Sequence, residues 1–234
     1  MSGKTVYFPH SYAVFGILLF VLLVVVGLLF VGAMGAAFAE VGFSPLVIAL
    51  ILVGTFFGSF INIPLKRLKT TVPLIREDYA GFFGLGFRVP RVEFNEVSTL
   101  LAVNVGGAVI PTIVSIYLLA NATLETVLYS LLSVFLVTLM AKATSRPVPG
   151  IGIATPGFVP PLVAVGVAFC FGHAAPLTVA YVGGVLGTLI GADLLNLGVI
   201  SKLGAPVASI GGAGAFDGVF LSGIFAVLWA GLAT

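Results

Sequence analysis

The chain has 234 residues, of which 60% are hydrophobic and only 8% are charged. Soluble domains carry about 25% charged residues, so this composition excludes a soluble globular protein and indicates an integral membrane protein. With one cysteine and two histidines, the sequence offers no disulfide framework and no cysteine- or histidine-based metal site. The net charge of +2 reflects loop charge and does not suggest a nucleic-acid partner.

Apolar segments of membrane-spanning length recur along the chain, because about 20 apolar residues are needed to cross a bilayer. The predicted spans are residues 12–39, 44–64, 97–119, 124–141, 158–171, 177–200 and 215–233. The first run is far longer than the roughly 7–15 apolar residues of a signal peptide, so we expect it to be retained as a span.

Residues 66–96 form the long hydrophilic segment of the sequence. We predict a cytoplasmic loop here, with aromatic rings at the level of the lipid headgroups. Within it, residues 88–94 alternate like a short edge strand that carries a proline, and such a strand could pair with an unwound peptide.

The basic residues favour one orientation. With a cytoplasmic N-terminus and seven spans, all ten Lys and Arg residues fall on the cytoplasmic side, as the positive-inside rule requires. Glu40, Glu125 and His173 then fall on the other side. The predicted fold class is therefore all-α: one transmembrane domain over residues 1–234, a bundle of about seven helices with the N-terminus in and the C-terminus out.

Two aspartates, Asp193 and Asp217, lie inside the last two predicted spans. An ionisable residue within hydrocarbon costs about 2.5–3.5 kcal/mol even on lenient insertion scales, so it marks a functional site by default. The two spans are joined by a short loop, and we expect the carboxyls to face each other across a cavity that opens to the cytoplasm.

Small and polar residues surround these aspartates. Small residues spaced four apart let helix backbones approach closely. We expect one such face on the sixth span, from Gly184, Gly187 or Thr188, and Gly191, and another on the seventh, from Gly214, Gly218 and Ser222. Asn104 fits a ligand site or a link between helices. The predicted supporting residues are Asn196, Gly191, Gly214, Gly218 and Asn104.

The stretch that begins at Gly214 and reads Gly-x-x-Asp217-Gly-Val-Phe-Leu-Ser, after a span with its own aspartate, resembles the catalytic pair of presenilin and signal-peptide-peptidase proteins. The family pattern is Gly-x-Gly-Asp, and this chain has Phe216 where the pattern has the glycine directly before the aspartate. The resemblance implies an intramembrane aspartyl protease with Asp193 and Asp217 as catalytic residues, a transmembrane peptide as substrate, membrane lipid as surroundings, and no metal or cofactor.

Over its whole length the chain resembles an uncharacterised family of archaeal and bacterial multi-span membrane proteins, which implies a prokaryotic plasma membrane. A second function stays open, because residues 104–111 resemble residues 181–188 in a predicted span of opposite direction. Broken helices at matching positions of an inverted repeat are typical of transport sites. The alternative is therefore a proton- or cation-coupled transporter or channel with the aspartates as its ion site; a structural or assembly role ranks third.

Overall fold

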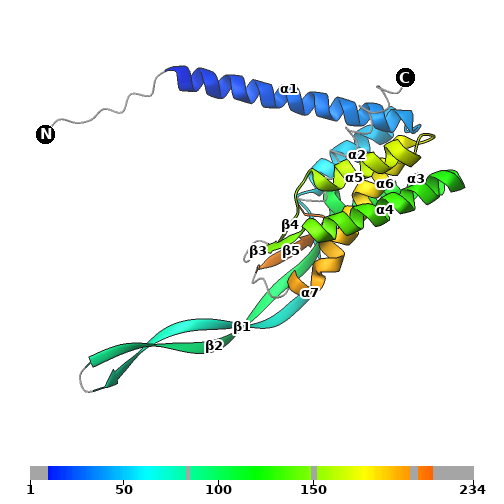
Figure 1. The fold of residues 1–234 in the computed structure, drawn as a ribbon. Helices are drawn as coiled ribbons and strands as arrows, with labels where there is room; N and C mark the ends of the chain where they lie inside the picture. Colours follow the sequence, from blue (N-terminus) through cyan, green and yellow to red (C-terminus); the bar gives the residue numbers. More distant parts are fainter. Residues whose placement is uncertain (1–9, 83–84, 149–151, 201–204, 213–234) are drawn as a thin grey trace.

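The computed structural model describes residues 10–82, 85–148, 152–200 and 205–212 (Figure 1). Most of these residues are helical, as the sequence predicts. The longer helices are α1 (His10–Glu40), α2 (Pro45–Gly58), α3 (Ile110–Ala120), α4 (Leu124–Thr144), α5 (Val159–Phe171) and α6 (Pro176–Thr188). Shorter helical pieces are η1 (Val105–Val109), η2 (Leu189–Asp193), η3 (Leu194–Asn196) and α7 (Leu197–Ile200).

Within the part of the chain that the structure describes, three helical segments are long and apolar enough to cross a membrane: Val14–Glu40, Leu124–Thr144 and Pro176–Val199. The other apolar helices, Pro45–Gly58, Val105–Ala120 and Val159–Phe171, are shorter. These helices are consistent with a helical membrane protein, whereas the number of spans and the orientation of the termini stay predictions. The seventh predicted span lies outside the described residues.

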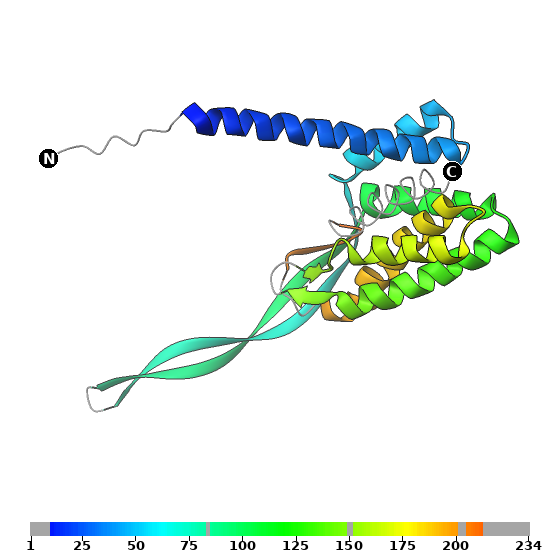
Figure 2. The ribbon, with the colours of Figure 1, turned by 45° about the horizontal axis from the view of Figure 1, so that its top comes forward.

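The fold is mostly helical but not all-α, because the described residues of the loop predicted at 66–96 lie in two long strands. Their cytoplasmic location stays a prediction. Strands β1 (Asn62–Phe82) and β2 (Leu85–Asn104) form one long antiparallel hairpin that projects from the helices (Figures 1 and 2). Its second strand includes residues 97–104. The first part of the predicted third span, residues 97–119, is therefore a strand, and helical structure begins only at η1. This apolar run has no clear helical period, and such a run cannot be assigned to helix or strand from sequence alone.

The hairpin continues into a small sheet at the base of the helices. Strand β5 (Val207–Ile210) pairs in parallel with β2, with Val207 opposite Leu100 and Ile210 opposite Val103, which gives the strand order β1-β2-β5. A second, two-stranded sheet pairs β3 (Arg146–Val148) with β4 (Gly152–Ala154) between α4 and α5. The β2–β5 pairing brings the residues that follow α7 back to the helices.

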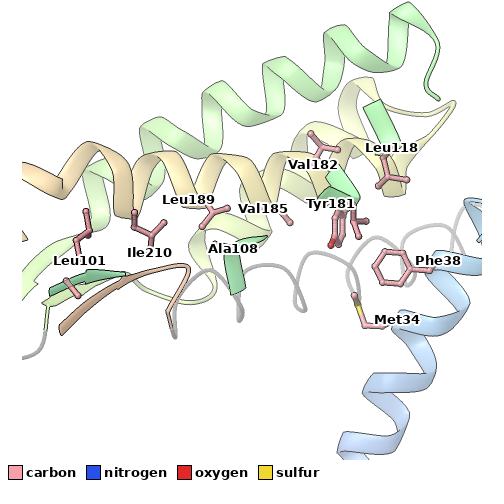
Figure 3. Packing of buried hydrophobic residues seen from close by; sticks show 12 residues of the cluster. Met34, Phe38, Leu101, Ala108, Leu118, Tyr181, Val182, Val185, Leu189 and Ile210 are labelled. Carbon is pink, nitrogen blue, oxygen red and sulfur yellow. The ribbon is translucent and has the colours of Figure 1, made fainter. Parts of the chain in front are cut away.

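Helix α6 is the centre of the core (Figure 3). It is buried along almost its whole length. Its Tyr181 ring meets the Phe38 ring of α1 edge to face, with centroids 5.4 Å apart. Val182, Val185 and Leu189 of the same segment belong to a cluster that includes Met34, Leu101, Ala108, Leu118 and Ile210. The packed core therefore holds the end of α6, from which η2 continues, in a fixed position.

Glycines of α6 and η2 pack closely against α4, a partner that the sequence did not indicate. Cβ atoms added at Gly183 and Gly187 would overlap Ser133 and Val137 of α4, and one at Gly191 would lie 2.5 Å from the carbonyl oxygen of Thr138. Gly183, which was not among the predicted residues, belongs to this face, and the prediction for Gly184 stays untested. Gly214 and Gly218 lie outside the described residues.

Candidate functional site

Asp193 ends a π-helical turn that interrupts the sixth apolar segment. Helix α6 stops at Thr188, the π turn η2 runs to Asp193, and the 3₁₀ turn η3 follows. Single π turns inside helices are frequent at functional sites. The half-buried Asp193 carboxyl accepts a hydrogen bond through Oδ2 from the backbone N–H of Gly211, at 2.7 Å. The bond fixes the carboxyl to the loop that directly follows β5.

Glycines allow three pieces of backbone to meet beside this carboxyl. A Cβ atom at Gly106 would overlap the Thr55 carbonyl oxygen at the end of α2, and one at Gly107 would overlap the Gly211 carbonyl oxygen. Gly211 itself has a φ of +71°, which side chains rarely tolerate, and its Cβ would lie 2.7 Å from the backbone nitrogen of Ala108. The position of the Asp193 partner therefore depends on the absence of side chains in η1 and after β5.

Asn104 holds the junction between β2 and η1. Its Oδ1 accepts from the N–H of Gly107 at 2.7 Å, while its Nδ2 donates to the Ser59 carbonyl at 2.7 Å and to Asn62 Oδ1 at 3.2 Å. Asn62 Oδ1 also accepts from Ser209 Oγ on β5 at 2.5 Å. Asn104 therefore links α2, β1 and η1, and through Asn62 it reaches β5.

Replacing Asn104 with alanine is expected to lower the free energy of unfolding by about 2–4 kcal/mol, because a buried side chain with three hydrogen bonds is lost and its partners are left unpaired. Asn121→Ala is the matched control. Its Nδ2 donates only to the Tyr117 carbonyl at an exposed helix end, and we expect a change within about 0.5 kcal/mol. Denaturation in detergent measures both, and equal losses would contradict a central role for Asn104.

Asn196 and Lys142 form a polar contact on the far side of the π turn. Asn196 Nδ2 donates to the carbonyls of Gly191 at 3.2 Å and Ala192 at 2.8 Å. Its Oδ1 accepts from Lys142 Nζ at 2.6 Å, and Lys142 also donates to the Leu195 carbonyl at 2.8 Å. Sequence reasoning treated Lys142 only as a loop cation. The available signal was its place at the end of the fourth predicted span, because the sixth predicted span was expected to end on the same side of the membrane.

The structure brings part of the predicted site together. Asp193, Asn196 and Gly191 lie in one interrupted segment, and Asn104 reaches it through Gly107 and Gly211. Asp217 lies outside the described residues, so its contact with Asp193 stays a prediction. Among the residues that the structure describes, no group of three or more His, Cys, Asp or Glu side chains could hold a metal ion.

The chain matches the model of the family described as "Protein of unknown function (DUF1614)" over residues 56–229. The matched region begins within α2 and extends past the described residues, so it includes both aspartates and the hairpin but leaves α1 outside. Neither the curated proteins nor the solved structures contain a match to this chain.

Proposed function

The chain belongs to the DUF1614 family of proteins of unknown function, and from the geometry around Asp193 we propose that it is an intramembrane aspartyl protease. In this proposal Asp193 and Asp217 form the carboxyl pair, and the substrate is a transmembrane peptide. The observation that carries the proposal is the hydrogen bond between Gly211 and Asp193. It ties one carboxyl to the start of the glycine-rich stretch in which the second follows six residues later.

Chain length limits how far apart the two aspartates can be. Six residues reach at most about 22 Å even when fully extended, so the chain itself keeps Asp217 within that distance of Gly211. The Gly211 N–H engages Oδ2, and no described residue donates to Oδ1. Oδ1 is thus the atom that we assign to the water and to the second carboxyl.

The chemistry needs only these groups. Two carboxyls that share a proton cannot both ionise at close range, so one is ionised and the other is protonated. The ionised carboxyl takes a proton from water as general base while the water oxygen attacks the scissile carbonyl carbon. The protonated carboxyl donates to the carbonyl oxygen as it gains negative charge. A proton then passes to the leaving nitrogen when the C–N bond breaks.

The sheet beside Asp193 offers a place for an extended substrate. Strand β5 is at the edge of the order β1-β2-β5 and, within the described ranges, pairs with β2 alone. It ends at Ile210, next to the Gly211 that holds Asp193. A peptide can add to such an edge through main-chain hydrogen bonds. β5 is therefore better placed than residues 88–94, which lie in the outer part of the hairpin (Figure 1).

The transport alternative has weaker support. Residues 104–111 pass from a strand through a π turn into α3, whereas residues 181–188 lie within the regular helix α6, so the two segments do not share one broken-helix form. The ammonium of Lys142 also lies against the Leu195 carbonyl. A fixed positive charge beside the interrupted helix opposes binding of a second cation at these carbonyls.

We further propose the seven-span arrangement with the N-terminus inside. The hairpin, β3, β4 and α7 gather at one end of the helices, and the α3–α4 and α5–α6 connections lie at the other (Figures 1 and 2). In a Cys170→Ala background, Lys69→Cys is expected to react with an impermeant thiol reagent from the cytoplasmic side and Glu125→Cys from the outside. Reaction of both positions from the same side would contradict this arrangement.

The protease proposal is tested with the purified chain in liposomes that contain labelled transmembrane peptides. We expect release of soluble peptide fragments, identified by mass spectrometry, with no added metal or cofactor. The same liposomes report proton and cation movement through an enclosed dye. Absence of cleavage across a panel of helical substrates, together with ion movement that depends on Asp193, would reverse the ranking of the two functions.

A further inference from the structure

We propose that Lys142 is a positioning residue for Asp193 and acts through Asn196 on the interrupted segment that carries the carboxyl. Lys142 lies in the last turn of α4, and Asn196 ends η3, 54 residues later. The Lys142 Nζ atom is 2.6 Å from Asn196 Oδ1 and 2.8 Å from the Leu195 carbonyl oxygen. The contact joins two membrane helices at the level where the Asp193 turn lies.

Asn196 also forms hydrogen bonds to the π turn. Its Nδ2 donates to the carbonyls of Gly191 and Ala192, the two residues directly before Asp193. The segment changes from α to π to 3₁₀ geometry over a few residues, which disrupts the regular hydrogen-bond ladder. Backbone groups without partners are costly in a membrane, so an interruption persists where side chains satisfy them. Asn196 supplies the donors here.

Only one orientation of the Asn196 amide satisfies the hydrogen-bonding groups of Lys142 and of the π turn together. An ammonium can only donate and a carbonyl can only accept, so Asn196 must turn Oδ1 toward Lys142 and Nδ2 toward the π turn. Asn196 is 7% exposed, which leaves little room for another orientation. Hydrogen bonds from a charged donor are roughly twice as strong as neutral ones. Lys142 therefore fixes the orientation of the Asn196 amide, and the amide in turn stabilises the geometry of the π turn.

The α4 side of the contact is itself held in place. Thr138 Oγ1 donates to the Gly187 carbonyl at 3.3 Å, one turn before Lys142 along α4. Gly191 packs against the Thr138 carbonyl and the Ala141 side chain. Because the two helices are in close contact here, loss of the Lys142 charge acts on the turn without separating α4 from α6. The effect on cleavage rests on the proposed function, whereas the control of the turn geometry does not.

The first test measures the geometry without any catalytic assay. A cysteine at Leu194, an exposed position beside Asp193, is introduced in a Cys170→Ala background, and its rate of reaction with a thiol reagent is followed in liposomes. Lys142→Met is expected to change this rate by at least about tenfold, since a hydrogen bond to a charged group has a comparable effect on an equilibrium constant. Lys142→Arg, which keeps the charge and the donors, is expected to restore most of the wild-type rate.

Two further variants make the result specific. Lys69→Met removes an equal charge from β1, away from the turn, and is expected to leave the labelling rate unchanged. Asn196→Asp keeps an acceptor for Lys142 but removes the donors to Gly191 and Ala192, and is expected to change the rate as Lys142→Met does. It also serves if Lys142→Met fails to fold. Wild-type labelling rates in both turn variants would overturn the proposal.

The second test uses cleavage. Lys142→Met is expected to lower kcat at an unchanged KM, and Lys142→Arg to recover it, because the substrate edge is untouched while the carboxyl is displaced. Altered labelling with wild-type kcat would overturn the catalytic part of the proposal. A wild-type chain that cleaves no substrate, with labelling still altered in Lys142→Met, would instead overturn the protease function and leave the positioning role intact.

Discussion

Asp193→Asn is expected to lower the rate of peptide cleavage by about 10²–10⁴-fold, the range that a positioned general acid or base contributes. Asparagine has the same shape as aspartate and can still accept the Gly211 N–H through its side-chain oxygen. The fold should therefore persist while the carboxyl chemistry is lost. Asp217→Asn is expected to have an effect of the same order, since neither member of a carboxyl pair works alone.

The measurement is initial cleavage rate in liposomes, with thermal unfolding in detergent as the check on folding. Glu125→Gln is the matched control, because it removes an exposed carboxyl from the first turn of α4 and should leave cleavage unchanged. The double variant is expected to be no slower than the slower single variant, because the two carboxyls act as a unit. Single variants that retain near wild-type rates would exclude the carboxyl pair as the catalytic group.

Gly211→Ala is expected to lower the free energy of unfolding by about 2–5 kcal/mol, the range of severe single substitutions. Two costs combine at this position. The backbone has a φ of +71°, and the new Cβ would meet the backbone of Gly107 and Ala108 at 2.7 Å. Relief of this overlap requires the loop to move away from η1, which would also break the bond to Asp193.

Gly166→Ala provides the matched control on α5. A Cβ atom there meets nothing within 4 Å, and alanine is the better helix former, so we expect no loss of stability. Chemical denaturation in detergent compares the two variants, and the cysteine at position 194 reports whether the Asp193 turn moves. A Gly211→Ala protein as stable as Gly166→Ala would show that η1 and the loop after β5 are not in the close contact that we describe.

Features that depend on local composition could be predicted from the sequence alone. Long apolar runs are helical in a membrane because each backbone group must be satisfied within its own segment, and α1 and α4 begin and end close to the predicted bounds. An aspartate in such a run is conspicuous whatever surrounds it, so the sequence alone made Asp193 and its neighbour Asn196 candidate site residues. The resemblance to an uncharacterised family agrees with the match to a family of unknown function.

Tertiary structure decided what depends on distant partners. Residues 97–104 form a strand because β1 lies on one side and β5 on the other, and β5 is about a hundred residues away in the sequence. The sequence does not distinguish Lys142 from an ordinary cation at a helix end, because its partner Asn196 is 54 residues away. The glycine that faces α4 is Gly183, since helix rotation is set by packing and small residues occur on both sides of α6. These contacts join segments far apart in the chain, so no local sequence pattern predicts them.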